Sequence, residues 1–162
     1  MRSPQLFDGR PLIEAAHQSH WSTLLLRLPA PKESGLPPPS QSLSATVIHK
    51  KMIKTQNNIC ARYGADFVAS EDEMKAGIAL NTLGKKPIHG LRHPIEKDTC
   101  GWYIWCGEEF SDASDFFQPL HVKHLRDYLP DILPYLGLPP GYRFLLDGEH
   151  IDVWFDEKLL DV

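Results

Sequence analysis

Four histidines have the residue type and spacing of a possible metal site. His121 and His124 are three residues apart in a segment with helical periodicity, so both side chains can project from one side of a helix. His89 and His93 lie on a loop-like segment and would join them only if folding brings the two segments together. Because imidazole is a common ligand of zinc and related ions, such a set would suit a small metal-dependent enzyme.

The metal interpretation lacks the motif that usually accompanies it. The sequence has no HExxH, and no third ligand can be assigned from spacing. Histidines at helical spacing are more often ordinary surface or core side chains, and this interpretation is favoured here. We therefore predict no metal and no cofactor, with the four-histidine site kept as the alternative.

Motifs of nucleophilic catalysis and phosphate binding are missing from the sequence. It contains no GxSxG, no GxGxxG and no GxxxxGK[ST]. Cys60, Cys100 and Cys106 form no CxxC, and an odd number of cysteines does not make a disulfide framework. We expect free thiols that are buried or half-buried, and a protein that is not an enzyme.

A group of acidic residues follows the most aromatic part of the chain. Its members are Glu108, Glu109, Asp112 and Asp115. Acids in a polar loop are usually solvated, and the alternatives are contact with a partner or a weak cation site. Phe110 lies among them, and aromatic side chains beside charges are typical anchors of protein interfaces. These five residues are the candidate partner-binding surface.

Charge is divided unevenly along the chain. Residues 1–51 contain six Lys/Arg and three Asp/Glu, a net charge of +3, whereas residues 52–162 contain 11 and 18, a net charge of −7. An acidic domain repels nucleic acids and anionic membranes, so neither is expected as a partner. It favours a protein with a basic surface, because opposite charges speed the encounter.

The sequence also predicts a cytoplasmic location. No apolar run approaches the roughly 18 residues that a membrane span needs. Asp8, Arg10 and Glu14 occupy positions where the apolar segment of a signal peptide should begin.

Short helices and strands, without regular βαβ alternation, would position these residues. Residues 101–107 are aromatic and β-branched between two glycines and predict a buried central strand, with Trp102 and Trp105 on opposite faces. The other predicted strands are residues 66–68, 77–82, 88–92, 142–146 and 151–155. The predicted helices are residues 50–63, a brief one after the Ser70 to Glu73 capping box, 121–129 and 131–136. These patterns predict an α+β fold with a mainly antiparallel sheet.

Residues 1–45 differ in composition from the rest of the chain. Their Pro/Ser-rich stretch cannot bury much surface, so we expect a poorly ordered N-terminal extension, in which residues 12–28 have the spacing of a short helix. Residues 46–162 carry the apolar patterns and are expected to form one domain with helices packed on its sheet.

An ordered series of motifs in residues 52–162 resembles a known family. The series consists of Asn81, PIHGLRHP at residues 87–94, GWYIWCGEEFS at 101–111, DFFQPLHVKHL at 115–125, PYLGLPPGYRF at 134–144 and DVWFD at 152–156. It is similar to the bacterial immunity protein 33 family. The resemblance implies a protein associated with polymorphic toxins or secretion systems, which protects its producer by binding a cognate toxin.

The resemblance brings no catalytic motif with it, and it does not identify the toxin. A basic toxin such as a nuclease would fit the acidic domain, because acids on an inhibitor can occupy a groove built for phosphates. Two alternatives stay open: the metal-dependent enzyme described above, and an adaptor without a toxin partner. The sequence leaves the oligomeric state and the mode of inhibition open.

Overall fold

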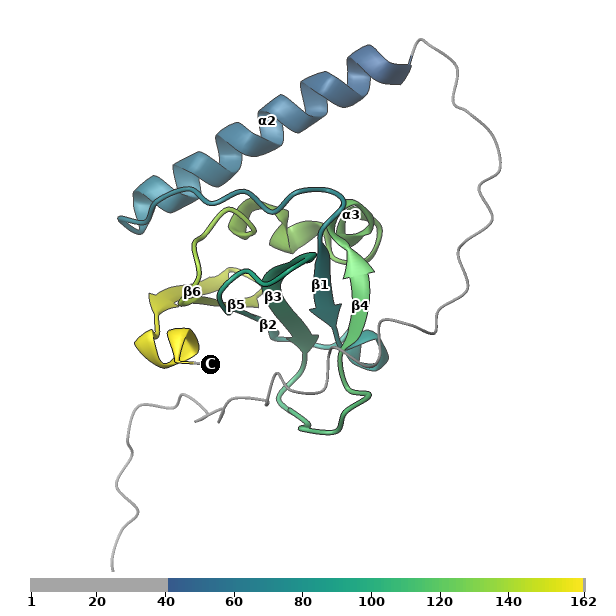
Figure 1. Ribbon diagram of the computed structural model, residues 1–162, viewed down its shortest axis with the longest axis vertical. Helices are drawn as coiled ribbons and strands as arrows, with labels where there is room; N and C mark the ends of the chain where they lie inside the picture. Colours follow the sequence, from purple (N-terminus) through teal and green to yellow (C-terminus); the bar gives the residue numbers. More distant parts are fainter. Residues whose placement is uncertain (1–40, 162) are drawn as a thin grey trace, which may run out of the picture.

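Six strands form one mixed sheet in the order β4-β1-β3-β2-β5-β6 (Figure 1). The strands are β1 (Lys75–Ile78), β2 (Ile88–Arg92), β3 (Thr99–Cys106), β4 (Gln118–His121), β5 (Tyr142–Asp147) and β6 (His150–Phe155). Neighbouring strands run antiparallel except β1 and β3, which are parallel. Together with the helices that pack on the sheet, this is the predicted α+β fold with a mainly antiparallel sheet.

The computed structural model describes residues 41–161, so the predicted disorder of residues 1–40 and the possible helix at 12–28 lie outside the described residues. Helix α2 (Gln41–Arg62) confirms the helix expected at 50–63 and begins nine residues earlier. It runs through residue 45, and the division of the chain there stays a prediction. Within residues 41–161, no helix has both the length and the apolar character needed to cross a membrane.

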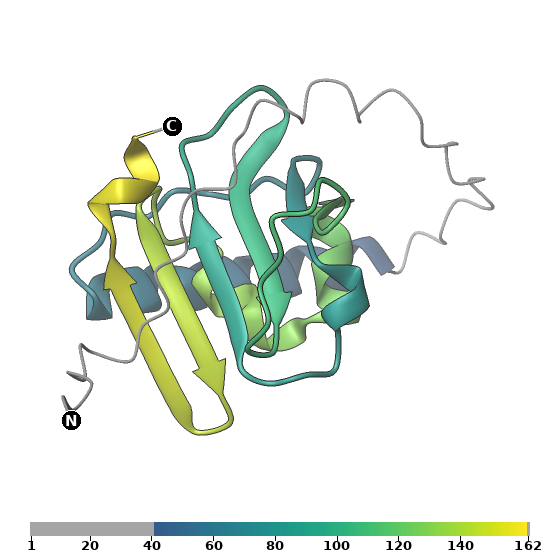
Figure 2. The same cartoon turned by 90° about the horizontal axis from the view of Figure 1, so that it is seen from below.

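Helices cover one face of the sheet, which we call the helix face. The 3-10 helices η3 (Val122–His124) and η4 (Pro130–Tyr135) and the short helix α3 (Leu125–Tyr128) lie next to this face, and α2 packs beyond them (Figure 1). Figure 2 looks onto the opposite face, which we call the loop face, with α2 behind the strands. The loop face carries the β3–β4 loop, residues 107–117, and the C-terminal 3-10 helix η5 (Glu157–Leu160).

Strand β3 divides its side chains between these two faces. Trp102 and Ile104 belong to the large core on the helix face, whereas Trp105 belongs to a separate aromatic cluster on the loop face. Both tryptophans are buried, and the predicted separation of Trp102 from Trp105 is confirmed. Gly101 has a φ of +80°, and a Cβ at this position would overlap the carbonyl oxygen of His93, so only glycine fits here.

A fully buried arginine joins three segments on the helix face. Arg92, with 0% of its surface exposed, donates hydrogen bonds to five backbone carbonyl oxygens at 2.5–3.3 Å. The acceptors belong to Val68, Ala69, Cys100, Leu136 and Leu138. Within residues 41–161, no carboxylate forms an ion pair with it. Burial lowers the pKa of Arg92 to about 10, and backbone dipoles take the place of a counter-ion.

Several local predictions are wrong for a physical reason. Residues 66–68 are irregular and not a strand, since the Val68 carbonyl accepts from Arg92 and the Val68 amide donates to the Gly137 carbonyl. No helix follows Ser70, whose hydroxyl donates to the carbonyl of Leu136 at 2.8 Å and does not cap a helix. The strand expected at 77–82 ends at Ile78 and is followed by the 3-10 helix η2 (Leu80–Thr82).

Candidate functional site

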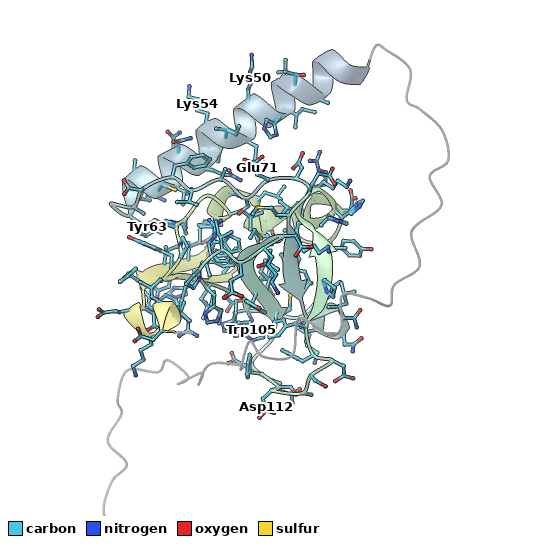
Figure 3. All side chains as sticks on the ribbon, in the orientation of Figure 1. Lys50, Lys54, Tyr63, Glu71, Trp105 and Asp112 are labelled. Carbon is cyan, nitrogen blue, oxygen red and sulfur yellow. The ribbon has the colours of Figure 1, made fainter. Side chains whose placement is uncertain are left out.

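The predicted acidic residues lie together on the loop that joins β3 to β4. Glu108, Glu109, Asp112 and Asp115 are all exposed. Figure 3 shows Asp112 at one end of the molecule, with Lys50 and Lys54 of α2 at the other end. A loose contact of 3.9 Å joins Glu109 Oε2 to Lys85 Nζ, and an exposed pair of this kind contributes little to stability.

Aromatic side chains hold this loop against the sheet. The ring of Phe110 is half-buried and meets the buried Trp105 edge-on at 5.3 Å. Phe116 and Phe117 pack on Phe110 at 5.6 and 6.1 Å, and Phe117 also meets the ring of Tyr103. Five aromatic rings therefore form one cluster, which we call the aromatic support of the loop.

The packing of the aromatic support changes the role assigned to Phe110. The sequence suggested Phe110 as a partner contact among the acids, and the structure directs its ring inward, toward Trp105. Trp105 is 2% exposed, so it does not offer the exposed indole that an interface anchor would need. Phe110 as a contact residue stays a prediction, but its packing gives it a clear role in fixing the loop.

His89 continues this cluster onto strand β2. Its imidazole stacks on the indole of Trp105, with ring centroids 4.7 Å apart and planes 7° from parallel. Burial is the main cause that lowers the pKa of His89; the carboxylate of Glu108 acts in the opposite direction, and the Arg143 guanidinium lowers it further. His89 lies inside β2, where the sequence also predicted a strand, and not on a loop.

His93 is committed to a backbone contact. Its Nδ1 lies 2.9 Å from the carbonyl oxygen of Leu159. Because a carbonyl oxygen only accepts, Nδ1 carries the hydrogen and donates a hydrogen bond to that oxygen. Its ring meets Tyr103 edge-on at 5.4 Å. Burial lowers the pKa of His93 and raises the pKa of Tyr103 to about 12.

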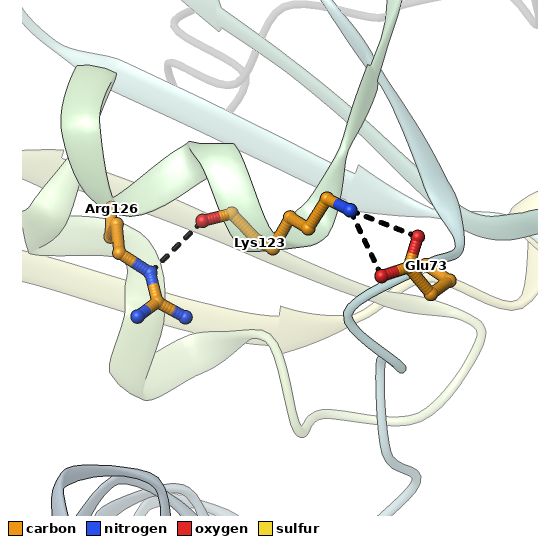
Figure 4. Close-up of polar contacts among 3 residues, drawn as sticks. All are labelled: Glu73, Lys123 and Arg126. Atoms are coloured by element: carbon orange, nitrogen blue, oxygen red, sulfur yellow. Dashed lines mark hydrogen bonds and ion pairs between the residues drawn. The ribbon is translucent and has the colours of Figure 1, made fainter. Parts of the chain in front are cut away.

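His121 and His124 lie elsewhere, where β4 passes into η3. Their ring centroids are 6.2 Å apart. Between them in sequence, Lys123 Nζ binds both carboxylate oxygens of Glu73 at 2.9 and 3.0 Å, and Arg126 Nε donates to the Lys123 carbonyl (Figure 4). This ion pair lowers the pKa of Glu73.

The structure does not assemble the alternative metal site from His89, His93, His121 and His124. Among residues 41–161, no group of three or more His, Cys, Asp or Glu side chains is placed to hold a metal ion. The first two histidines are buried against aromatic rings of the loop face, and the second two lie at the end of β4. Helical spacing was a poor guide because His121 is the last residue of a strand.

The cysteines are free and buried, which confirms the sequence prediction. Burial raises the pKa of the thiols of Cys60, Cys100 and Cys106. A raised pKa disfavours the thiolate that nucleophilic catalysis needs. These residues therefore act as packing residues, and the Cys60 thiol also donates to the Gly137 carbonyl at 3.2 Å.

One arrangement on the loop face was not found from the sequence. The guanidinium of Arg143, on β5, binds Asp156 at 2.7 Å and lies 5.8 Å from the ring of Trp154. Burial lowers the pKa of Arg143, and Asp156 opposes that effect. The alternation of β5 places Arg143 on the loop face, but only the pairing of β5 with β2 brings it near His89.

The fold and its loop face define a small α+β domain whose distinctive surface is an acidic loop on an aromatic support. The chain belongs to the Imm33-like domain family, whose family model matches residues 55–156. This confirms the membership of the immunity protein 33 family expected from the motifs, and the family implies a toxin partner in general. No curated protein and no solved structure matches the chain significantly.

Proposed function

We propose that this protein binds and neutralises a cognate bacterial toxin by protein–protein contact, without catalysing a reaction. Membership of the Imm33-like family supports the toxin as partner. The observation that carries the proposal on this chain is the acidic loop of residues 107–117, whose four acids are exposed while its phenylalanines pack on the sheet.

The aromatic support prepares the loop for binding. Ordering a mobile loop costs free energy on association, and a loop that is already fixed avoids much of that cost. The inward rings of Phe110, Phe116 and Phe117 fix the backbone from which the acids project. The loop therefore presents charge in a defined geometry, which gives selectivity as well as attraction.

The partner chemistry follows from the sign of this charge. Residues 52–162 carry a net charge of −7, and the lysines of α2 lie at the end of the molecule away from the loop (Figure 3). A basic toxin surface, such as the phosphate-binding groove of a nuclease, complements the loop. The loop acids would then occupy sites that the toxin offers to its substrate.

Charge reversal of the loop tests this proposal. We expect replacement of Glu108, Glu109, Asp112 and Asp115 by lysine to weaken toxin binding by about 100-fold or more, because each attraction becomes a repulsion. The toxin candidate is the product of the neighbouring gene, and affinity is measured by calorimetry beside protection of cells that express it.

A matched variant controls for net charge. It replaces four exposed acids outside the loop, Asp66, Glu71, Asp72 and Asp127, by lysine. This variant should keep most of its affinity, and both variants should fold, since exposed side chains contribute little to stability. Equal affinity of the loop variant and the unaltered protein would remove the loop from the interface.

The location of this encounter and the class of protein are part of the proposal. We place the interaction in the cytoplasm, and cell fractionation with an antibody against the full chain checks it. No observation on the described residues favours the metal-dependent enzyme, and metal analysis of protein purified without a histidine tag provides an independent check: a stoichiometric metal lost on changing His121 and His124 would support that alternative.

A further inference from the structure

Among the described residues 41–161, two buried nitrogen atoms on the loop face have no hydrogen-bond partner. They are Nε2 of His89 and Nη2 of Arg143, in side chains of residues that are 6% and 8% exposed. A buried polar group without a partner costs about 1–3 kcal/mol, and folded proteins keep few of them. Two on one face of one sheet indicate a site made for an acceptor.

Strand register brings the two residues together. In the antiparallel pair of β2 and β5, His89 lies opposite Leu145 and Leu91 lies opposite Arg143. His89 and Arg143 are therefore diagonal neighbours on the same face, within reach of a long side chain. The effect of the Arg143 charge on His89 agrees with this proximity.

Both side chains are held in position before any ligand arrives. The His89 ring is stacked on Trp105, and Arg143 Nη1 is bound to Asp156 Oδ2 at 2.7 Å. The Trp154 ring lies against the guanidinium on another side. Among the described residues, His89 Nε2 and Arg143 Nη2 are the buried side-chain nitrogens without a hydrogen-bond partner.

We propose that His89 and Arg143 bind a single carboxylate, supplied by an acidic side chain or the C-terminus of the protein partner. A carboxylate has two oxygens in one plane, so one can accept from Arg143 Nη2 and the other from His89 Nε2. The inference rests on the proposed function for its partner, while the receptor itself is defined by this chain alone.

Charge balance couples this binding to a proton. Asp156 already compensates Arg143, so a second carboxylate brings a net negative charge unless His89 takes up a proton. The charged groups that act on His89 are Glu108 from the loop, which favours protonation, and Arg143 from β5, which opposes it. Carboxylate affinity should therefore fall by about tenfold for each unit by which pH rises above the pKa of free His89, because binding there requires the uptake of one proton.

The site also extends the acidic loop. Glu108 belongs to both surfaces, because it is exposed with the loop acids and acts electrostatically on His89. A partner that offers basic groups to the loop and one carboxylate to His89 and Arg143 complements both surfaces. A partner with basic groups alone leaves the two nitrogens unpaired, as they are in the free protein, so it gains less on binding than a partner that also supplies a carboxylate.

The test uses formate, because both nitrogens are shielded from solvent and a small probe reaches them most readily. The full chain with isotope-labelled histidine is titrated by NMR with sodium formate, with sodium chloride at the same ionic strength as the control. The ring signals of His89 should shift and saturate with formate, and its pKa should rise. His93, whose Nδ1 is already bound to Leu159, is the internal control and should not respond.

Variants separate the possible outcomes. Arg143→Met and His89→Phe, which keeps a ring on Trp105, should each abolish the formate response, with folding checked by circular dichroism. Absence of a formate response in the unaltered protein overturns the proposal and leaves a buried water as the acceptor. A stronger response to inorganic phosphate overturns the carboxylate assignment.

Toxin binding then tests the source of the carboxylate. His89→Phe should weaken toxin binding by about tenfold, as expected for one charge-assisted contact. Unchanged affinity of this variant, in a protein whose loop variant has lost binding, would refute a carboxylate from the partner while the proposed function stands.

Discussion

Arg92 and Arg143 are two buried arginines on neighbouring strands, and they serve opposite faces of the sheet. On the helix face, Arg92 donates to five carbonyl oxygens and joins three segments of backbone. On the loop face, Arg143 binds one carboxylate, and its Nη2 has no partner among residues 41–161. The guanidinium is fully hydrogen-bonded on the helix face and only partly hydrogen-bonded on the loop face, and this difference supports the binding role proposed for the loop face.

The charge compensation of the two arginines differs in the same way. Arg92 is compensated by backbone dipoles, which no partner can displace without unfolding the chain. Arg143 is compensated by Asp156, a partly exposed carboxylate that lies at the N-terminal end of η5, where its side chain accepts from the Lys158 amide. The counter-ion of Arg143 is therefore a side chain that can move without breaking backbone hydrogen bonds of the sheet.

Removing Arg92 should have the largest effect. Arg92→Met removes a donor from five backbone carbonyl groups, of which Leu136 keeps Ser70 and Trp102 as donors, and we expect a loss of about 3–5 kcal/mol of unfolding free energy. Urea denaturation of the full chain measures it.

Arg143→Met is the matched change on the loop face. It removes one hydrogen-bonded ion pair, and the Asp156 carboxylate that is left is 22% exposed and can be hydrated, so the loss of stability should be smaller than that of Arg92→Met, which removes five hydrogen bonds. Equal losses of unfolding free energy in the two variants would contradict the proposal that Arg92 stabilises the fold more than Arg143 does.

Truncation of Phe110 should cause an intermediate loss of stability. It should also lower toxin affinity without removing any of the four acids. Phe110→Ala removes a half-buried ring from the aromatic support, at an expected cost of about 2 kcal/mol. Because the loop backbone loses its anchor, toxin affinity should also fall although all four acids are present. Phe110→Leu is the control, and it should recover most of both quantities if packing is what matters.

The loss of folding stability at acidic pH should arise in part from two buried histidines on the loop face. The pKa values of His89 and His93 lie below the 6.5 of an unperturbed histidine, so the unfolded chain takes up protons there that the folded chain does not. Their contribution to stability is complete above pH 6.5 and is lost as pH falls toward the lowered values, with a slope of up to about 1.4 kcal/mol per pH unit for each residue.

Unfolding free energies measured across this range check the slope. His93→Gln should reduce it, because this variant lacks one of the two buried histidines. A slope that is the same in the unaltered protein and in His93→Gln would contradict the assignment.

Much of the sheet was predictable because the residue pattern and the local environment agree. Strand 88–92 has the predicted bounds, and β3 lies in the interior of the sheet with its tryptophans on opposite faces. The strands expected at 142–146 and 151–155 are present as β5 and β6, which pair antiparallel across a loop of two residues between Asp147 and His150. At these positions no distant contact competes with the local preference.

The errors lie where a distant contact prevails over the local pattern. Residues 66–68 have a strand-like composition, but the Val68 carbonyl bonds to Arg92, which comes from β2. Ser70 has the pattern of a helix cap but bonds to Leu136. Strand β4 was missed because Pro119 and the helical periodicity after His121 hid four residues that pair with β1.

The candidate site was predictable in part for the same reason. The acids of the loop could be read directly, since a polar loop is a local property. The pairing of His89 with Arg143 could not, because the two residues are more than 50 positions apart and are joined only by strand register. The inward direction of Phe110 depends likewise on the position of Trp105 in a neighbouring element.

The parallel pairing of β1 with β3 has a consequence for the time at which the proposed protection can begin. Strand β1 joins the sheet only between β3 and β4, and the edge strand β6 pairs with β5, so the sheet is incomplete until the chain has been synthesised through residue 155. Pairings between distant segments make folding slow compared with a helical bundle of the same length. A cell that relies on this protein should therefore contain folded protein before the toxin is present. Stopped-flow refolding measures the time that a newly made chain needs to fold.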